Sequence, residues 1–349
     1  MDLTKFDFNL PSELIAQYPV DKRDHSRLLI AHKDTLTIEH RFFYDLPEYL
    51  TNENLLILNK SRVIPARLYT NEKNGQNQLE FLLVKKTNDH CYEAMVKPGR
   101  KAKIGQRFDF SKKNSILTGA IEAILENGNR IINFQSPVEI EKSILALGQI
   151  PLPPYIQREV QSIDTHRYQT VFAEYDGSIA APTAGLHFTS DLIDKLMMNG
   201  VGIDYITLHV GPGTFKPVKT KQIEDHVISQ EEFFIESDVL QRLRETKKNK
   251  NKKITAVGTT ATRTLETLAP WILNDNELEQ IPHKTDIYIY PPYTFGVVDQ
   301  LITNFHLPKS SLFILVCAFC GLDFAHQIYQ EAIAKRYRFY SYGDAMLIL

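Results

Sequence analysis

Two regions of the chain differ in their pattern of apolar and turn-forming residues, and this difference constrains the fold. Residues 66–149 carry short β-prone segments separated by Gly, Pro and Asn roughly every 8–12 residues, a spacing typical of a small barrel or sandwich. The segments are residues 66–70, 78–85, 92–97, 107–110 and 130–134. From about residue 150, strands alternate with helical segments, which favours a three-layer α/β/α domain. We therefore predict a discontinuous α/β domain, residues 1–65 and 150–349, interrupted by an inserted β-barrel domain, residues 66–149.

Local patterns predict individual elements of the larger domain. Apolar runs indicate strands at residues 28–31, 55–58, 203–209, 254–257, 287–290, 296–299 and 301–306. Pro11 or Ser12 favours a helix start within residues 11–17. Thr189 is a suitable N-cap for a helix that runs to about Asn199.

The charge pattern limits how the chain could bind nucleic acid. The net charge of the 349 residues is −2, so attraction to a phosphate backbone must come from a local patch. Two basic segments are present, residues 97–103 (KPGRKAK) continued by Arg107, and residues 247–253 (KKNKNKK). Such basic segments are commonly exposed to solvent without binding a partner, and contact with a phosphate backbone is the alternative.

The cysteines and the apolar runs point to a cytosolic protein. Cys91, Cys317 and Cys320 provide no disulfide framework and suit a reducing compartment. Cys317 and Cys320 have C-x-x-C spacing but lack a second pair for zinc, so we predict core cysteines and no metal. The apolar run at residues 312–322 is too short for a bilayer, and the N-terminus lacks a signal pattern. We expect a cytoplasmic protein with no membrane partner.

Residues 179–188 (IAAPTAGLHF) have the composition of a ligand-binding turn. Small side chains let the backbone approach a ligand, and Pro182 and Gly185 suit a shaped turn. Open α/β proteins bind ligands where a strand passes into such a turn and then a helix, so we predict the floor of an active site here. Residues 257–260 (VGTT) place free N–H groups and hydroxyls at a helix start, an anion-friendly arrangement.

Four histidines have similar local positions: His187, His209, His226 and His306. Three of them follow apolar runs, which places them at strand ends on one rim of the sheet. Such histidines could bind metal, act as acid and base, or form hydrogen bonds inside a core. The spacing of a metal site is absent, and Asp225 beside His226 suggests an oriented imidazole. No nucleophile elbow or G-x-G-x-x-G turn is visible, so the residues alone leave the chemistry open.

Several long motifs resemble one family, the S-adenosylmethionine:tRNA ribosyltransferase-isomerases of queuosine biosynthesis. They run in the family's order and span essentially the whole chain: residues 6–11 (FDFNLP), 59–67 (NKSRVIPAR), 151–155 (PLPPY), 180–188 (AAPTAGLHF), 207–215 (TLHVGPGTF), 224–226 (EDH), 257–260 (VGTT) with Arg263, 303–308 (TNFHLP) and 337–346 (YRFYSYGDAM). Departures from the family pattern are mild. Lys60 stands where the family commonly has Asn or Asp, Pro212 stands where Ala is frequent, and Pro291–Pro292 stands where Pro-Gly is frequent.

The resemblance implies a reaction and a fold. S-adenosylmethionine, consumed as a substrate with no cofactor, would give its ribosyl unit to 7-aminomethyl-7-deazaguanine at the wobble position of a tRNA with a queuosine-type GUN anticodon. Adenine and methionine would leave, and epoxyqueuosine would remain in the tRNA. The fold implied is the α/β domain with an inserted barrel, and we expect a monomer.

The resemblance also suggests roles for individual residues. The acid–base candidates are His187, His209, His226 and His306, with Asp225 orienting a partner or binding the cationic amine. The substrate-binding candidates are Thr183, Gly185, Gly211, Gly213, Thr214, Thr259 and Thr260, with Arg62, Arg67 and Arg263 for phosphates or the methionine carboxylate. The candidates for tRNA contact are Lys97, Arg100, Lys101, Lys103 and Arg107, together with residues 247–253.

Two other classes compete with this reading. An RNA-binding module without chemistry would need only the barrel and the basic loops, and would leave the histidines unexplained. A methyltransferase that uses S-adenosylmethionine would ordinarily carry a Gly-rich turn after its first strand, which this chain lacks.

Overall fold

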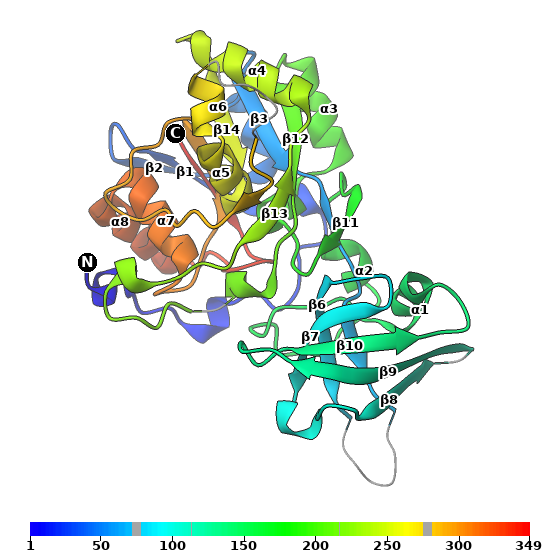
Figure 1. Ribbon diagram of the computed structural model, residues 1–349. Coiled ribbons are helices and arrows are strands. Elements are labelled where there is room, and N and C mark those ends of the chain that lie inside the picture. The colour runs from blue at the N-terminus through cyan, green and yellow to red at the C-terminus, as the bar shows by residue number, and fades with distance from the viewer. Residues whose placement is uncertain (72–77, 113, 216, 275–280) are drawn as a thin grey trace. The chain divides into compact units, whose positions relative to one another are not determined.

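The computed structural model describes residues 1–71, 78–112, 114–215, 217–274 and 281–349 (Figure 1). The chain forms two compact units. The larger contains residues 1–62, 154–158 and 166–349, and the smaller contains residues 63–153 and 159–165. The prediction assigned residues 1–65 and 150–349 to the α/β domain and residues 66–149 to the barrel. The observed boundaries differ from these by a few residues, and residues 159–165 pack with the smaller unit.

A nine-stranded sheet runs through the described part of the larger unit, in the order β15-β13-β12-β3-β14-β16-β17-β1-β2. Its centre is parallel, because β3 pairs in parallel with both β12 and β14, and β14 pairs in parallel with β16. The strands are β1 (Arg27–His32), β2 (Thr37–Phe42), β3 (Asn54–Asn59), β12 (Gly202–Leu208), β13 (Glu231–Phe234), β14 (Lys253–Val257), β15 (Lys284–Thr285), β16 (Gln300–Asn304) and β17 (Ala345–Ile348).

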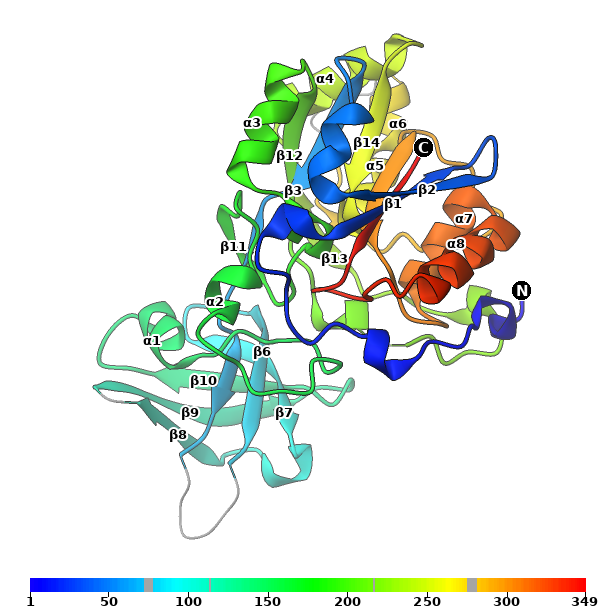
Figure 2. The ribbon, with the colours of Figure 1, turned by 180° about the vertical axis from the view of Figure 1, so that it is seen from behind.

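Helices cover both faces of this sheet, as Figures 1 and 2 show. In β3, Leu55 and Ile57 pack into one core, whereas Leu56 and Leu58 pack into the other. Successive side chains of a strand point to opposite faces, so a fully apolar strand needs a layer on each side. One layer contains α4 (Ser237–Lys248), α5 (Gly258–Thr267), α6 (Ala269–Leu273), α7 (Ser311–Cys320) and α8 (Leu322–Ala334), and the other contains α3 (Ser190–Met198) and the 3₁₀ helix η4 (Phe43–Glu48). The predicted three-layer α/β/α domain is confirmed.

The smaller unit contains a six-stranded antiparallel sheet in the order β5-β6-β7-β10-β9-β8. The sheet nearly closes into a barrel, because the Asn71 N–H, just after β5, donates to the Asp109 carbonyl of β8 at 2.9 Å. Phe81, Phe110 and Phe134 fill the interior. The elements are β5 (Arg67–Tyr69), β6 (Glu80–Lys86), β7 (Cys91–Lys97), β8 (Arg107–Lys112), β9 (Ser115–Ile124), β10 (Arg130–Gln135) and α1 (Ile140–Leu147). The predicted inserted barrel is confirmed.

The remaining described elements are short. A two-stranded sheet pairs β4 (Ser61–Val63) with β11 (Tyr175–Ser178), and α2 spans Asp164–Arg167. The other 3₁₀ helices are η1 (Leu3–Phe6), η2 (Ser12–Leu14), η3 (Arg23–His25), η5 (Gly99–Lys101), η6 (Thr183–His187), η7 (Pro212–Phe215) and η8 (Ile223–Asp225).

Three local expectations were wrong. Residues 11–17 form only η2, after which Ile15 makes a bridge with Phe339. Residues 287–290 and 296–299 form no strand. In the second of these segments, the N–H groups of Gly296, Val297 and Val298 donate to the carboxylate of Glu266, which takes the place of a strand partner. The predictions near β1, β3, β12, β14, β16 and α3 are confirmed, with Thr189 capping α3.

The cysteines are free thiols, with Cys317 buried and Cys320 partly buried in α7. No single helix of the described residues is long and apolar enough to cross a membrane. Taken together, α7 and α8, which are bent by 115° relative to each other, are long and apolar enough by length and composition alone.

Candidate functional site

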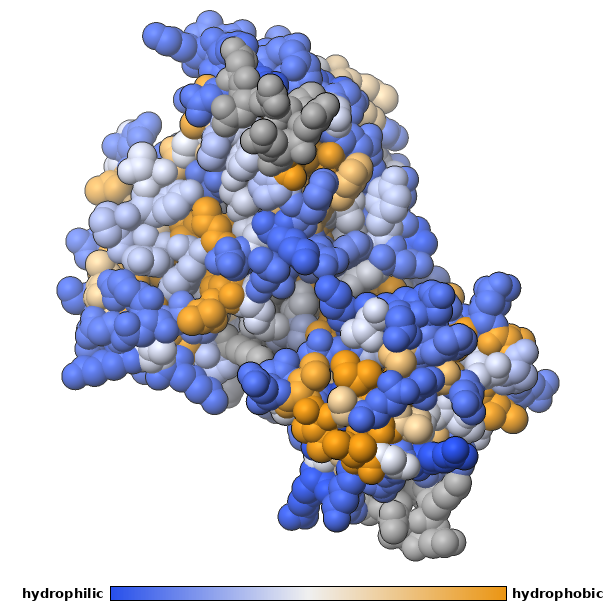
Figure 3. All heavy atoms as spheres, viewed as in Figure 1, coloured by the Kyte–Doolittle hydropathy of each residue, from blue (hydrophilic) through white to orange (hydrophobic). Residues whose placement is uncertain are grey.

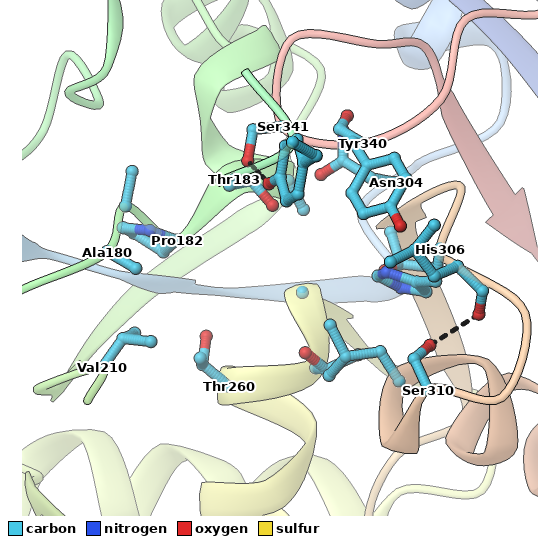
Figure 4. Close-up of a pocket in the computed structure, with 18 of the residues that line it drawn as sticks. Ala180, Pro182, Thr183, Val210, Thr260, Asn304, His306, Ser310, Tyr340 and Ser341 are labelled. Carbon is cyan, nitrogen blue, oxygen red and sulfur yellow. Dashed lines mark hydrogen bonds between the residues drawn. The ribbon is translucent and has the colours of Figure 1, made fainter. Parts of the chain in front are cut away.

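One pocket of the larger unit lies at the carboxyl ends of parallel strands (Figure 4). Its lining includes residues at or just after the carboxyl ends of β12, β14 and β16, which are neighbours or near neighbours in the sheet. Open α/β sheets bind their ligands at this edge. Centres of water molecules can occupy about 90 Å³ of this first pocket.

Small residues allow the walls of the first pocket to approach one another. Residues 180–184 form one wall, and Thr183 begins η6. Opposite them, Gly258 turns the chain from β14 into α5 with a φ of +88°, a conformation that favours glycine. A Cβ at this position would lie 3.5 Å from Ala184 Cβ. The predicted floor of a site at residues 179–188 therefore lies against the predicted anion-friendly turn.

Two helices begin at the first pocket. Thr259 and Thr260 lie in the first turn of α5, which has no side-chain cap, and both line the pocket. At α7 the Ser310 hydroxyl accepts from the Phe313 N–H at 3.2 Å and donates to the Leu307 carbonyl at 2.7 Å. The first N–H groups of a helix have no partner within the helix, so both helix starts can donate to a ligand.

The described lining of the first pocket carries no charged side chain. It combines apolar groups with hydroxyls, an amide and an imidazole: Tyr155, Ala180, Ala181, Pro182, Thr183, Ala184, Val210, Pro217, Gly258, Thr259, Thr260, Thr303, Asn304, His306, Leu307, Pro308, Ser310, Leu312, Tyr340 and Ser341. A neutral, largely apolar group with a few polar atoms fits such a lining.

His306 is the histidine of the predicted four that lines the first pocket. Its Nε2 lies 2.8 Å from the Thr303 hydroxyl, and its backbone N–H donates to the Tyr329 hydroxyl at 3.0 Å. Burial lowers the pKa of His306 to about 3, so the imidazole is neutral at pH 7.

His187 lies behind the first pocket rather than in its lining. Its Nδ1 is 2.7 Å from the Ser26 hydroxyl, its Nε2 is 3.0 Å from Asn304 Nδ2, and its ring stacks on Phe43 at 5.0 Å. Burial, with a smaller contribution from Arg338, lowers the pKa of His187 to about 3. His187 therefore reaches this pocket through Asn304.

His209, His226 and Asp225 are not among the described lining residues of the first pocket. His209 Nδ1 is buried and has no hydrogen-bond partner in the described residues, and a Cβ on Gly177 would lie 2.7 Å from its ring. His226 packs edge-on against Tyr288 with 5.4 Å between ring centroids. Asp225 is exposed, and within the described ranges no hydrogen bond joins it to His226. Burial lowers the pKa of both histidines.

A second pocket contains a buried ion pair. Arg263 Nη1 donates to Glu231 Oε2 at 2.5 Å, and Arg263 Nε donates to the Ile287 carbonyl at 3.1 Å. Arg263 Nη2 is buried with no hydrogen-bond partner in the described residues. Gly213 and His226 line this pocket, and Leu312 lines both pockets. The Gly211 N–H donates to Glu231 Oε1 at 3.1 Å, and the Thr214 side chain lies outside the described part of the structure.

Three further candidates are occupied by local contacts. Arg62 is exposed and donates to the Ala173 carbonyl at 2.7 Å. Arg67, in the smaller unit, donates to Glu80 at 3.0 Å and to the Leu152 carbonyl at 3.1 Å. Gly185 is buried, and a Cβ there would lie 2.9 Å from Thr170 and Phe172, so its small size serves packing.

The basic loop of the barrel lines an open groove. The described lining includes Arg100, Lys101, Lys103 and Arg107, with about 820 Å³ open to water centres. Lys97, at the end of β7, is exposed. Arg130 holds the loop by donating to the Gly99 carbonyl at 2.6 Å and to the Ala102 carbonyl at 3.4 Å. In the other basic segment, Lys247 donates to Asp299 at 3.0 Å.

Sequence reasoning did not single out Tyr155, Asn304, Tyr340 or Ser341, although all four line the first pocket. All four lie within or at the end of the family-like motifs at residues 151–155, 303–308 and 337–346, and this was the available signal. No group of three or more His, Cys, Asp or Glu in the described ranges could hold a metal ion.

Comparisons with known proteins agree along the whole chain. The family model described as queuosine biosynthesis protein matches residues 3–348. The chain is 48% identical to the S-adenosylmethionine:tRNA ribosyltransferase-isomerase of Thermotoga petrophila and 44% identical to that of Clostridioides difficile, with 100% of each chain covered. It is also similar to the crystal structure of S-adenosylmethionine tRNA ribosyltransferase from Thermotoga maritima, with a TM-score of 0.54 and 37% identity over 99% of this chain and 100% of that one.

Proposed function

The chain belongs to the queuosine biosynthesis protein family, and from this premise we propose that it transfers and isomerises the ribosyl moiety of S-adenosylmethionine onto 7-aminomethyl-7-deazaguanine in tRNA. It is a transferase-isomerase whose substrates are S-adenosylmethionine and tRNA. The acceptor base occupies the wobble position of a GUN anticodon, adenine and methionine leave, and epoxyqueuosine remains in the tRNA. S-adenosylmethionine is consumed, and no cofactor takes part.

One observation carries the proposal. Identity of 44–48% over the full length joins this chain to proteins named for the reaction. The first pocket supports the adenosyl part of the substrate, because its lining is neutral and lies at the carboxyl ends of parallel strands. The second pocket, which shares Leu312 with the first, supports the methionyl part, since Arg263 Nη2 could pair with a carboxylate.

The reaction requires several proton transfers. A base removes a proton from the carbon beside the sulfonium, the acceptor amine loses a proton, and adenine needs a proton or a hydrogen bond as it departs. Of the proposed acid–base histidines, His306 has the strongest support, because it lines the first pocket and is neutral before the reaction begins. His209, His226 and Asp225 remain candidates for the other transfers, and we propose a positioning role for His187.

The products of the reaction test the proposal. Protein incubated with S-adenosylmethionine and tRNA that carries the precursor base should release free adenine and methionine, and tRNA without that base should release neither. S-adenosylhomocysteine would instead indicate methyl transfer, and tRNA binding without any product would indicate an RNA-binding module. Either of these results would contradict the proposed function.

The histidines can be tested in the same assay. His306→Gln keeps a polar side chain but cannot take up a proton, and it should lower turnover about 10²-fold or more. Single His→Ala variants at residues 187, 209 and 226 form the comparison set. Normal turnover in all of these variants, with normal folding, would rule out the acid–base assignment.

A further inference from the structure

The orientation of the Asn304 amide is fixed by its surroundings. Asn304 Nδ2 donates to His187 Nε2 at 3.0 Å, to the Tyr340 carbonyl at 3.2 Å and to the Asp344 carbonyl at 3.4 Å. Two of these acceptors are backbone carbonyls, which can only accept, so the amide nitrogen must face them. The Asn304 oxygen, Oδ1, is left buried with no hydrogen-bond partner in the described residues, on a residue that lines the first pocket.

His187 reinforces this orientation. Because its Nε2 accepts from Asn304, the ring proton lies on Nδ1 and is donated to the Ser26 hydroxyl at 2.7 Å. Burial keeps the imidazole neutral, since it lowers the pKa of His187 to about 3, and Nε2 therefore stays an acceptor at neutral pH. Ser26, His187 and Asn304 thus form a chain of hydrogen bonds that ends at a free acceptor, Asn304 Oδ1.

Tyr340, which also lines the first pocket, provides a second unpaired polar atom. Its hydroxyl is buried without a hydrogen-bond partner in the described residues. Its backbone has a φ of +74°, unusual for a residue other than glycine, and is held by an N–H bond to the Phe305 carbonyl at 3.0 Å and by the Asn304 amide. Figure 4 shows Asn304, Tyr340 and His306 together at one end of the first pocket.

Buried polar atoms are rarely left without partners, because an unpaired one loses the hydrogen bonds that it would make with water. Asn304 Oδ1 needs a donor, and the Tyr340 hydroxyl can donate to an acceptor. A neutral group with an N–H donor next to an acceptor would therefore satisfy both atoms and suit the uncharged lining. The exocyclic amino group of adenine and the ring nitrogen next to it have this pattern. The cationic amine of the other substrate does not, because no carboxylate lies in the described lining.

We propose that Asn304 and Tyr340 recognise the adenine of S-adenosylmethionine. Asn304 Oδ1 accepts a hydrogen bond from the exocyclic amino group, and the Tyr340 hydroxyl donates to N1 or N7 beside it. His187 is a positioning residue that holds the amide in the accepting orientation. This assignment rests on the proposed function, because it takes S-adenosylmethionine as the ligand.

Ligand analogues test each contact. We would measure binding of S-adenosylmethionine, its inosyl analogue, and its 1-deaza and 7-deaza analogues by calorimetry. The inosyl analogue replaces the amino group with a carbonyl and sets two acceptors against each other, so wild-type protein should bind it about 100-fold more weakly. One of the two deaza analogues, which each lose a ring acceptor, should bind about three- to tenfold more weakly.

Tyr340→Phe removes one hydroxyl and keeps the ring. In this variant S-adenosylmethionine and the sensitive deaza analogue should bind equally, while the inosyl penalty remains. Tyr288→Phe is the matched control, because its hydroxyl is also buried without a hydrogen-bond partner in the described residues but lines the second pocket. It should leave the ranking of the four ligands unchanged.

His187→Phe should reduce the preference for S-adenosylmethionine over the inosyl analogue, and His187→Gln, whose amide oxygen can accept, should restore part of it. Loss of stability alone would not change this ratio. Equal binding of the inosyl analogue by wild-type protein, or an unchanged deaza penalty in Tyr340→Phe, would overturn the assignment. Release of adenine in the tRNA assay is scored separately, so normal turnover with either result would contradict the adenine contacts but not the proposed function.

Discussion

At the scale of single residues, burial keeps two histidines neutral in the folded protein. His187 and His306 both have pKa values lowered to about 3 by burial. Each ring is neutral in the folded protein, so its two nitrogens have fixed hydrogen-bonding roles. In the unfolded chain the same rings titrate near pH 6.5.

This difference predicts acid destabilisation. Below pH 6.5 the unfolded state binds protons that the folded state does not, so the free energy of unfolding falls as pH falls from about 6.5 toward 3. Each histidine should contribute a slope approaching about 1.4 kcal/mol per pH unit in the lower part of this window. Urea unfolding at pH 7, 6 and 5 measures the slope. The slope should be shallower in His306→Gln than in wild-type protein. An unchanged slope would contradict the assignment of His306 as neutral in the folded protein.

The pair of Arg263 and Glu231 poses a different electrostatic problem. Both side chains are almost fully buried, so removal of either partner leaves a charge without compensation. Losses of about 3–5 kcal/mol in unfolding free energy are typical of such changes. By contrast, Lys309 and Asp7 form an exposed ion pair, with 2.6 Å between Lys309 Nζ and Asp7 Oδ2.

We therefore expect Glu231→Gln and Arg263→Met each to lower the unfolding free energy by about 3–5 kcal/mol, and the double variant to lose less than the sum. Asp7→Asn is the control and should cost about 1 kcal/mol or less. Chemical denaturation of the four variants measures these values. Additive losses would mean that the two side chains do not stabilise each other.

At the scale of elements, the chain enters and leaves the barrel at one narrow crossing. Arg67 and Gln149 exchange backbone hydrogen bonds of 3.1 and 2.8 Å there. Gly148 follows α1 at this point, and a Cβ on it would lie 1.8 Å from the Pro65 carbonyl oxygen. The two connecting segments can approach this closely only because residue 148 has no side chain.

Gly148→Ala should destabilise the smaller unit by about 3 kcal/mol or more, because backbone rather than a flexible side chain would have to move. Hydrogen exchange resolved by peptide measures this as faster exchange in β5 to β10. Gly105→Ala is the control. Its Cβ meets open space, so only its φ of +79° is unfavourable, and it should cost about 1 kcal/mol. Similar exchange in the two variants would show that the crossing tolerates a side chain.

At the scale of the whole molecule, charge and apolar surface are unevenly distributed. The net charge is −2, whereas Arg100, Lys101, Lys103 and Arg107 gather on one groove of the barrel. Figure 3 shows apolar surface over the same unit, whose exposed apolar side chains include Met95, Ile104, Ile116 and Ile124. A local basic groove can attract a phosphate backbone even though the overall charge is negative.

Changing the four basic groove residues to Gln should weaken tRNA binding and flatten its dependence on salt. The slope of log K against log salt should become shallower by about 0.7–0.9 for each phosphate that the variant no longer neutralises. Lys248, Lys250 and Lys252 changed to Gln form a second arm that tests the other basic segment. Lys195→Gln with Lys335→Gln, both exposed in the larger unit, is the control. If the groove variant kept the wild-type salt slope, the groove would be excluded as a site of tRNA contact.

Local patterns in the sequence are enough to predict the main elements and their layers. Leu55 to Leu58 are apolar without interruption, and such a run demands cover on both faces of a sheet. Thr189 fixed the start of α3, because its side chain accepts from Leu192 N–H. Such signals are local, so they could be predicted without knowledge of distant parts of the chain. The ten-residue strand β9 was missed, although its neighbours were predicted.

Which residues contact one another depends on tertiary packing. Histidines with similar local patterns separated into a pocket residue, His306, and a core residue, His187, because burial depends on distant segments. Residues 296–299 resemble a strand, but the carboxylate of Glu266 takes their N–H groups. The free oxygen of Asn304 follows from contacts with residues 187, 340 and 344, which no local pattern connects. Hydrogen-bond partners far apart in the chain depend on how strands and loops are brought together, and the fold alone provides that information.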